Sequence, residues 1–227
     1  RGFFYLYSFE SAIFVKKKNM IYDNILSDNK EGVCYITINR PKQLNALNGV
    51  TISELNKAIS AADKDTSVRC IVLTGADTKA FVAGADIKEF AAFDKNEGEK
   101  LALKGQELLF NLLENASTPS IAAINGFALG GGLELAMACH IRIASDNAKM
   151  GLPEVSLGVI PGYGGTQRLA TLVGKGKALE MITTAGMLSA AEAKEWGLVN
   201  HVCSQKDLIP MAEKLALKIK RNSPMAI

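Results

Sequence analysis

Residues 126–140 read GFALGGGLELAMACH, and Glu134 is the only acidic side chain among the glycines and apolar residues of this stretch. The run before it, residues 120–125, is typical of a buried strand, and the three consecutive glycines predict a sharp turn into a helix over residues 133–139. Backbone amides at such a helix start are free to bind an anion or a developing oxyanion. A carboxylate among apolar groups loses hydration, which shifts its pKa. Glu134 is therefore a candidate functional residue, and compensation of the helix dipole is the structural alternative.

The rest of the chain alternates short β-branched runs with longer helical patterns, which predicts an α/β fold in one domain over residues 20–227. The expected strands cover residues 21–26, 33–39, 70–74, 120–125, 141–144 and 198–202, with a hairpin turn at residues 29–32 between the first two. Further expected helices cover residues 52–62, 101–113, 189–197 and 208–219. The third of these begins with a capping box formed by Ser189 and Glu192.

The composition is that of a globular protein with a sizeable core, because 48% of the 227 residues are hydrophobic and the net charge is only +3. Basic residues are spread along the chain, which disfavours nucleic-acid binding. Cys34, Cys70, Cys139 and Cys203 lie far apart in apolar runs, so we expect buried, reduced thiols rather than a zinc site or a disulfide framework. No apolar run is long enough to cross a bilayer. Residues 1–19 carry no processing pattern, and we expect them to be a non-functional extension.

Common nucleotide and hydrolase motifs do not occur in the sequence. Residues 162–167 lack the third glycine of a dinucleotide fingerprint, residues 174–177 lack a complete phosphate loop, and there is no G-x-S-x-G elbow. His140 and His201 have no carboxylate or thiol beside them at ligand spacing. We therefore expect neither a metal site nor a histidine-based triad.

Two more glycine-bearing segments are candidates for a site. In residues 79–88, KAFVAGADIK, the small residues around Gly84 leave backbone amides open to a ligand, although a surface turn with Asp86 as a helix N-cap explains them equally well. In residues 151–169, Glu154 follows a proline, where an acid in a first helical turn is the structural alternative. Glu154 and Glu134 could perform acid and base chemistry on one substrate if the fold brings them together.

Four segments in order resemble the crotonase, or enoyl-CoA hydratase, family. They are NRPKQLNALN at residues 39–48, KAFVAGADIKEF at 79–90, INGFALGGGLELAMAC at 124–139 and GLPEVSLGVIPGYGGTQRL at 151–169. The resemblance extends from Met20 to Ile227 and is greatest for the bacterial short-chain members of the family. It implies an α/β, crotonase-like spiral of repeated strand-strand-helix units. The C-terminal helical region of the family is largely absent, so we expect the chain to be truncated relative to its relatives.

The resemblance also implies a role for each candidate catalytic group. Glu134 would hold and deprotonate a water molecule, and Glu154 would deliver a proton to the α-carbon of an enoyl thioester, with the roles exchanged in dehydration. The amides of Ala85 and Gly131 would bind the thioester oxygen as an oxyanion hole. The implied reaction is the reversible addition of water to a short-chain trans-2-enoyl-CoA.

Further residues are expected at the substrate on the same ground. The implied substrate-binding residues are Ala85, Asp86, Ile87, Lys88, Gly131, Gly162 and Lys42. Gly162 would offer an amide to the water, and Lys42 would approach the coenzyme A phosphates, with a solvated turn lysine as an equal alternative. His140 stands where many relatives carry an Asp, and we expect it to be a structural side chain.

The family implies no metal and no cofactor, because coenzyme A is part of the substrate. It also implies a cytoplasmic homotrimer or hexamer that takes an acyl-CoA and has neither a nucleic-acid nor a membrane partner. Three alternatives stay open: double-bond isomerisation by the same fold, RNA binding through a lysine-rich face as in some relatives, and an inactive scaffold that binds coenzyme A.

Overall fold

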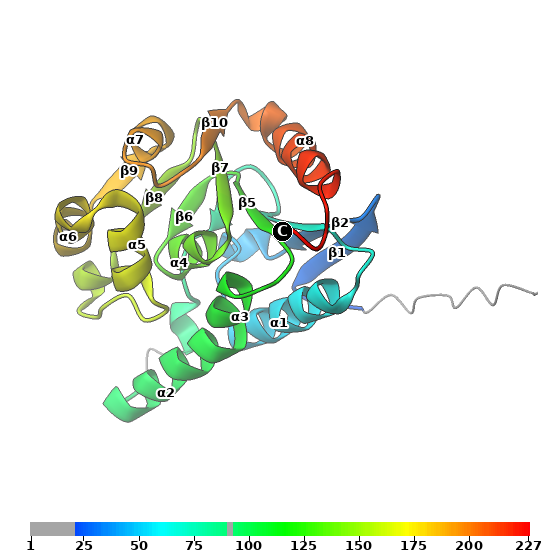
Figure 1. Cartoon of the computed structure of the whole chain (residues 1–227). Coiled ribbons are helices and arrows are strands. Elements are labelled where there is room, and N and C mark those ends of the chain that lie inside the picture. The colour runs from blue at the N-terminus through cyan, green and yellow to red at the C-terminus, as the bar shows by residue number, and fades with distance from the viewer. Residues whose placement is uncertain (1–20, 90–92) are drawn as a thin grey trace, which may run out of the picture.

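The computed structural model describes residues 21–89 and 93–227, which fold into two β-sheets flanked by helices (Figure 1). The six-stranded sheet has the order β1-β2-β3-β5-β7-β10, and the four-stranded sheet has the order β4-β6-β8-β9. The first sheet comprises β1 (Ile25–Lys30), β2 (Val33–Ile38), β3 (Cys70–Gly75), β5 (Ser120–Ile124), β7 (Ile141–Ser145) and β10 (His201–Cys203). The second comprises β4 (Ala80–Val82), β6 (Phe127–Leu129), β8 (Lys149–Gly151) and β9 (Met187–Ser189). The predicted α/β class is confirmed, and residues 1–19 lie outside the described ranges.

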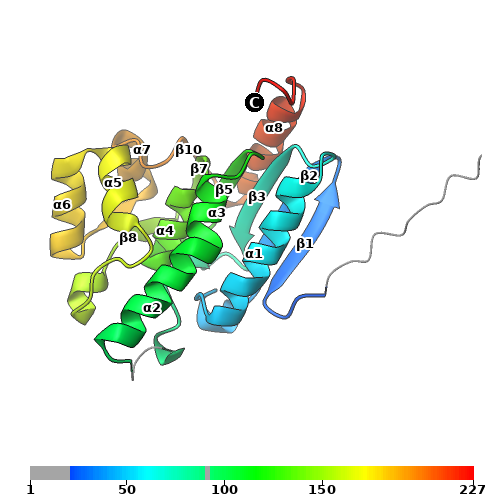
Figure 2. The same ribbon diagram turned by 60° about the horizontal axis from the view of Figure 1, so that its bottom comes forward.

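The six-stranded sheet separates two apolar cores. Along β3, Ile71 and Leu73 face the larger core and Val72 faces the smaller one, because side chains alternate across a strand. Helix α1 (Gly49–Lys64) packs on one face of this sheet and α8 (Leu208–Lys220) on the other, as Figure 2 shows. All pairs in this sheet are parallel except β1 with β2. The central strands are therefore buried on both faces, which explains their unbroken apolar runs.

Successive strands alternate between the two sheets. β3 is followed by β4, β5 by β6 and β7 by β8, and in each pair the second strand belongs to the four-stranded sheet. A helix follows each pair: α2 (Lys95–Gly105) after β4, α4 (Gly131–Ala138) after β6, and α5 (Gly165–Val173) with α6 (Lys175–Thr184) after β8. The predicted spiral of strand-strand-helix units is confirmed.

The first strand lies further along the chain than residues 21–26, where the sequence predicts it. It pairs with β2 through a two-residue turn at Glu31 and Gly32, whose φ angles are 53° and 80°. Such positive φ angles give a turn whose twist matches that of the strands. Most side chains of β1 are exposed, so no apolar pattern marked this edge strand.

The last strand and the whole second sheet also differ from the prediction. β10 begins three residues later than the predicted strand at 198–202, because Leu198 and Val199 pack into the larger core before the chain becomes extended. The four strands of the second sheet have three residues each, which is too short for a periodic pattern. They were therefore missed, although they position both glycine-rich segments.

The predicted helices form, and local capping explains where two of them begin. Asn48 caps α1 by accepting a 2.8 Å hydrogen bond from the amide of Thr51. The capping box of Ser189 and Glu192 is present at the start of α7 (Ala190–Glu195). The helix predicted at residues 208–219 is α8.

The helix predicted at residues 101–113 is interrupted by a π-helical turn, η3 (Gln106–Phe110), between α2 and α3 (Asn111–Glu114). Phe110 at its end stacks on Tyr163, with ring centroids 4.5 Å apart and an interplanar angle of 12°. A Cβ on Gly105 would stand 2.4 Å from the Tyr163 ring, so a glycine is required there. π-helical turns are frequent at functional sites. This one brings the helix against the residue that contacts Glu134.

Three of the four cysteines agree with the expectation of buried thiols. Cys34, Cys70 and Cys139 are buried, whereas Cys203 is only partly buried on the short last strand. Over the described ranges, no helix combines the length and the apolar character that crossing a bilayer requires.

Candidate active site

Glu134 lies in the first turn of α4 and is 1% exposed. Its Oε1 atom accepts hydrogen bonds from the amides of Tyr163 and Gly165, both at 2.8 Å. A Cβ on Gly165 would stand 2.8 Å from the same oxygen, which is closer than a van der Waals contact allows. The glycine-rich start of α5 is therefore shaped around this carboxylate.

The surroundings of Glu134 keep both of its protonation states accessible near neutral pH. Burial raises the pKa of its carboxyl to about 7, and the carboxylate of Glu154 also raises it. The amides of Gly165 and Tyr163 and the guanidinium of Arg168 oppose this rise, because they favour the charged form. A group with such a pKa can take up and release a proton during turnover.

Glu154 begins the 3-10 helix η4 (Glu154–Leu157) and lies against the turn that starts α4. A Cβ on Gly130 would stand 2.8 Å from Oε1 of Glu154, and Gly130 has a positive φ of 50°. The Oε2 atom of Glu154 is buried and has no hydrogen-bond partner among the described residues. Burial raises the pKa of this carboxyl as well. Two acids that the sequence separates by twenty residues thus lie at the same helix start.

The amide of Ala85 comes close to this helix start from the other glycine-bearing segment. Leu47 forms a parallel bridge with Ala85, in which Leu47 donates to the carbonyl of Gly84 and accepts from the amide of Asp86. In a parallel bridge of this kind, the amide of the central residue points away from the partner strand. A Cβ on Gly131 would lie 3.7 Å from the Ala85 nitrogen.

Gly131 is the first residue of α4, so its amide is among those that a helix leaves unpaired at its start. Together with the nearby amide of Ala85, it forms a pair of neighbouring donors at the start of α4. Such a pair can stabilise the negative charge that develops on a carbonyl oxygen. The structure therefore brings together Glu134, Glu154, Ala85 and Gly131, the four residues that sequence reasoning selected.

The other predicted binding residues lie around this centre. Asp86 forms an ion pair with Arg40 at 3.0 Å, in which both side chains are mostly buried, and it therefore does not present a free carboxylate. Ile87 and Lys88 are exposed on the 3-10 helix η2 (Ile87–Glu89). Lys42 is exposed on the short helix η1 (Pro41–Gln43), and Gly162 is exposed before α5.

Sequence reasoning missed the groups that hold Glu134. It named Gly162 as an amide donor to the water and did not name Tyr163 or Gly165, whose amides donate to the carboxylate. The sequence contains a signal for these donors, because Gly164 and Gly165 stand at the start of a helix as the glycines at the start of α4 do. The contribution of Arg168 had no local signal, since it depends on the tertiary fold.

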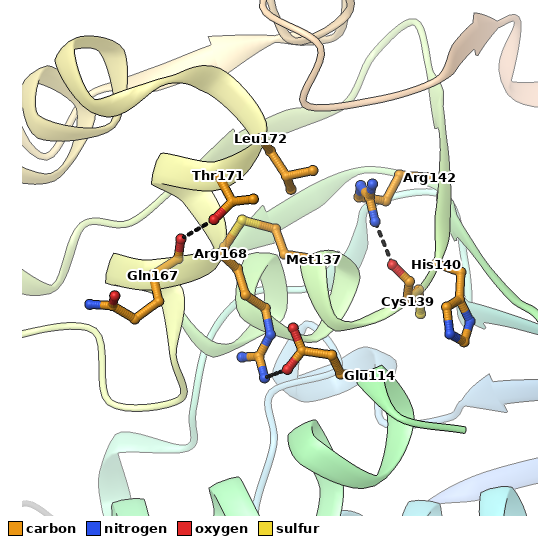
Figure 3. A pocket seen from close by; sticks show the side chains of 9 residues that line it. All are labelled: Glu114, Met137, Cys139, His140, Arg142, Gln167, Arg168, Thr171 and Leu172. Carbon is orange, nitrogen blue, oxygen red and sulfur yellow. Dashed lines mark hydrogen bonds and ion pairs between the residues drawn. The ribbon is translucent and has the colours of Figure 1, made fainter. Parts of the chain in front are cut away.

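A separate cavity of about 290 Å³ lies between the end of α4 and α5 (Figure 3). It is lined by Glu114, Met137, Cys139, His140, Arg142, Gln167, Arg168, Thr171 and Leu172. None of the four predicted catalytic residues lines it. His140 at its rim accepts a 3.0 Å hydrogen bond from the amide of Ser120 through Nδ1, a structural contact of the kind expected. Among the described residues, no cluster of His, Cys, Asp and Glu side chains has an arrangement that could hold a metal ion.

Comparisons with known proteins identify the family of this chain. The family model described as enoyl-CoA hydratase/isomerase matches residues 28–227. The chain is 48% identical to the short-chain-enoyl-CoA hydratase of Clostridium acetobutylicum, over 92% of this chain and 79% of that one. It is 45% identical to the crotonyl-CoA hydratase of Syntrophomonas wolfei, over 92% of this chain and 80% of that one.

A solved structure gives the same result for the fold. The crystal structure of the enoyl-CoA hydratase from Bacillus anthracis superposes with a TM-score of 0.86 at 42% identity, and the match covers 90% of this chain and 79% of that one. The chain therefore belongs to the enoyl-CoA hydratase/isomerase family.

Proposed function

We propose that this protein is an enoyl-CoA hydratase that adds water reversibly to a short-chain trans-2-enoyl-CoA such as crotonyl-CoA, with 3-hydroxybutyryl-CoA as the product. The observation that carries the proposal is the buried Glu134 and the half-buried Glu154, whose Oε2 atom is itself buried, beside two neighbouring amide donors. The names of the Clostridium and Syntrophomonas relatives support a short acyl chain. Coenzyme A is part of the substrate, so the reaction needs no further cofactor.

In the proposed hydration, each group in the site has one catalytic role. Ionised Glu134 takes a proton from a bound water, whose oxygen then forms a bond to the β-carbon of the enoyl thioester. The electron pair of the double bond moves onto the thioester oxygen, which the amides of Ala85 and Gly131 stabilise, each donor by about 3 kcal/mol. Protonated Glu154 donates its proton to the α-carbon and completes the addition. Dehydration runs through the same steps in reverse.

The nearest alternative is an enoyl-CoA isomerase, which moves a double bond with the same oxyanion hole. A single carboxylate that shuttles one proton is sufficient for that reaction, whereas addition of water requires proton transfer at both the water and the α-carbon. The two raised carboxyl pKa values support hydration. The RNA-binding and inactive-scaffold alternatives offer no role for two neighbouring acids with raised pKa values.

Loss of the enoyl-thioester absorbance with crotonyl-CoA tests the proposal. Wild-type protein is expected to turn over, and Glu134→Gln and Glu154→Gln are each expected to lose at least about 100-fold in kcat, because a general acid or base contributes on that order. Wild-type turnover that neither substitution affects would exclude the assigned roles. Consumption of a 3-enoyl-CoA without hydration of crotonyl-CoA would favour the isomerase.

Assembly and location are part of the same proposal. From the family resemblance, we propose that the protein is cytoplasmic and forms a homotrimer or hexamer. Size-exclusion chromatography with light scattering measures the assembly directly. The chain aligns with 79% of the length of the Clostridium relative, so the same measurement on the purified protein reports whether this chain assembles.

A further inference from the structure

Arg168 lies on α5 directly behind the proposed active site and is 8% exposed. Its Nη1 atom donates a 2.6 Å hydrogen bond to the carbonyl of Tyr163. Its Nη2 atom forms a 2.6 Å ion pair with the Oε2 atom of Glu114 at the end of α3. Figure 3 shows the ion pair of Arg168 with Glu114. The other end of this buried guanidinium contacts the loop that carries the two amides bound to Glu134.

The loop of residues 163–165 is held from both sides. The amide of Tyr163 donates to Glu134, and the carbonyl of the same residue accepts from Arg168. Gly164 between the two amides has a φ of 82°, and a Cβ there would stand 2.4 Å from Nη1 of Arg168. A glycine at this position allows the guanidinium to lie directly against the backbone. The orientation of both amides therefore depends on the arginine.

The charges around Glu134 are few and come from separate elements. Glu154 on η4 repels the ionised carboxylate, and the guanidinium on α5 attracts it. The pKa of the Tyr163 phenol is raised to about 12, so this ring stays neutral. Glu114, the partner of the arginine, is 46% exposed, and water therefore screens it more strongly than it screens the buried guanidinium.

We infer that Arg168 is a positioning residue of the proposed hydration: it holds the amides of Tyr163 and Gly165 against Glu134 and thereby keeps that carboxylate in place. Only the kinetic consequence of this inference rests on the proposed function. The side chain of Arg168 donates to the Tyr163 carbonyl and to Glu114 rather than to Glu134 or Glu154, and it therefore acts through the loop.

Two substitutions separate the charge of Arg168 from its hydrogen bond. Arg168→Gln can still donate to the Tyr163 carbonyl but carries no charge. Arg168→Lys keeps the charge, but its single ammonium group cannot contact both the Tyr163 carbonyl and Glu114 as the two guanidinium nitrogens do. Arg142→Gln is the matched control, because Arg142 is buried at 6% exposure and lines the same cavity, but its hydrogen bonds go to the carbonyls of Leu198 and Cys139.

The kinetic readout is the pH dependence of kcat/KM with crotonyl-CoA. Arg168→Gln is expected to move the acid limb up by about one pH unit, because loss of a nearby cation disfavours the ionised glutamate. Its kcat is expected to fall by up to about 100-fold with KM little changed, as for a misplaced catalytic group. Arg168→Lys should keep the acid limb near that of wild type. Arg142→Gln should leave the acid limb unchanged.

The cavity of Figure 3 provides a rescue experiment, because Arg168 is one of the residues that line it. In Arg168→Ala, guanidinium ion at millimolar concentration is expected to restore part of kcat, and the same concentration should not stimulate Arg142→Ala. Rescue of both variants, or of neither, would count against a role specific to this arginine.

A second readout does not require turnover. Carbon-13 NMR of the glutamate carboxyls, with Glu134→Gln to assign the resonance, follows the titration of Glu134 in wild type and in Arg168→Gln. An upward move of this titration supports the inference even if crotonyl-CoA is not hydrated, in which case only the hydratase proposal fails. An unchanged titration together with an unchanged acid limb would overturn the inference and leave Arg168 a purely structural residue.

Discussion

The Oε1 atom of Glu134 accepts a 2.8 Å hydrogen bond from the amide of Gly165, and a Cβ on Gly165 would stand 2.8 Å from the same oxygen. One glycine therefore supplies the donor and also the space that the carboxylate needs. The relationship joins the starts of α4 and α5, two helices whose glycine-rich beginnings lie on opposite sides of one buried acid.

Gly165→Ala tests this relationship. The added methyl group displaces the carboxylate of Glu134 or the amide that binds it, so kcat is expected to fall by about 100-fold. Gly98→Ala is the matched control, because Gly98 lies in α2 and a Cβ there meets nothing within 4 Å. The control should leave kcat unchanged and stabilise the fold by about 0.5 to 1 kcal/mol in denaturant unfolding. A fully active Gly165→Ala variant would contradict the proposed position of Glu134.

The pH dependence of kcat/KM follows from the pKa of Glu134. The free enzyme is active only when this carboxylate is ionised, so the rate is expected to fall as the pH drops below about 7. Initial rates measured with crotonyl-CoA between pH 5 and pH 9 check this. If the midpoint of the acid limb lay near the ordinary pKa of a glutamate, a different group would act as the base.

Glu134→Gln is expected to make the protein more stable at pH 8 while it removes activity. The folded-state pKa of Glu134, about 7, lies above the ordinary value of 4.5, so the folded state binds more protons than the unfolded state between these values. The free energy of unfolding therefore decreases as the pH rises from about 4.5 to about 7. Glutamine carries no charge to desolvate and should raise this free energy by about 1 to 3 kcal/mol.

Urea unfolding of wild type and variant at pH 5 and pH 8 measures this difference. The gain should be large at pH 8 and small at pH 5, where Glu134 is already neutral in the folded state. Glu99→Gln on the surface of α2 is the control and should change stability little at either pH. If Glu134→Gln changed the free energy of unfolding equally at both pH values, burial of the ionised carboxylate would not be the cause of the change.

The ion pair between Arg40 and Asp86 is expected to stabilise the loop that carries Ala85. Both side chains are less than one fifth exposed, at 13% and 18%, so the pair is weakly screened. A double-mutant cycle with alanine at both positions should give a coupling free energy of about 1 to 3 kcal/mol. The same cycle for Lys177 and Glu180, where the glutamate is 62% exposed, should give about 0.5 kcal/mol or less.

The kinetic effect of the same pair is a further check. Asp86→Asn is expected to lower kcat/KM, because a looser loop holds the Ala85 amide less firmly in the oxyanion hole. Catalysis unaffected by Asp86→Asn, together with the predicted coupling in stability, would show that the pair supports the fold but not the site.

Local patterns in the sequence determined most of the helices, but not α5 or α6, and the choice of catalytic candidates. Periodic apolar residues marked α1 and α8, the capping box of Ser189 and Glu192 marked α7, and the triple glycine before Glu134 marked the start of α4. These features depend on residues within one or two helical turns of each other, and such short-range preferences are written directly in the sequence.

Only the tertiary structure decided what surrounds Glu134. The strands of the second sheet have three residues each, and they form because neighbouring strands provide hydrogen-bond partners, not because of their own pattern. The contact between Glu134 and Gly165 spans 31 residues, and that between Arg40 and Asp86 spans 46. Such pairs depend on the register of two sheets and on burial, and both arise only when the whole chain is packed.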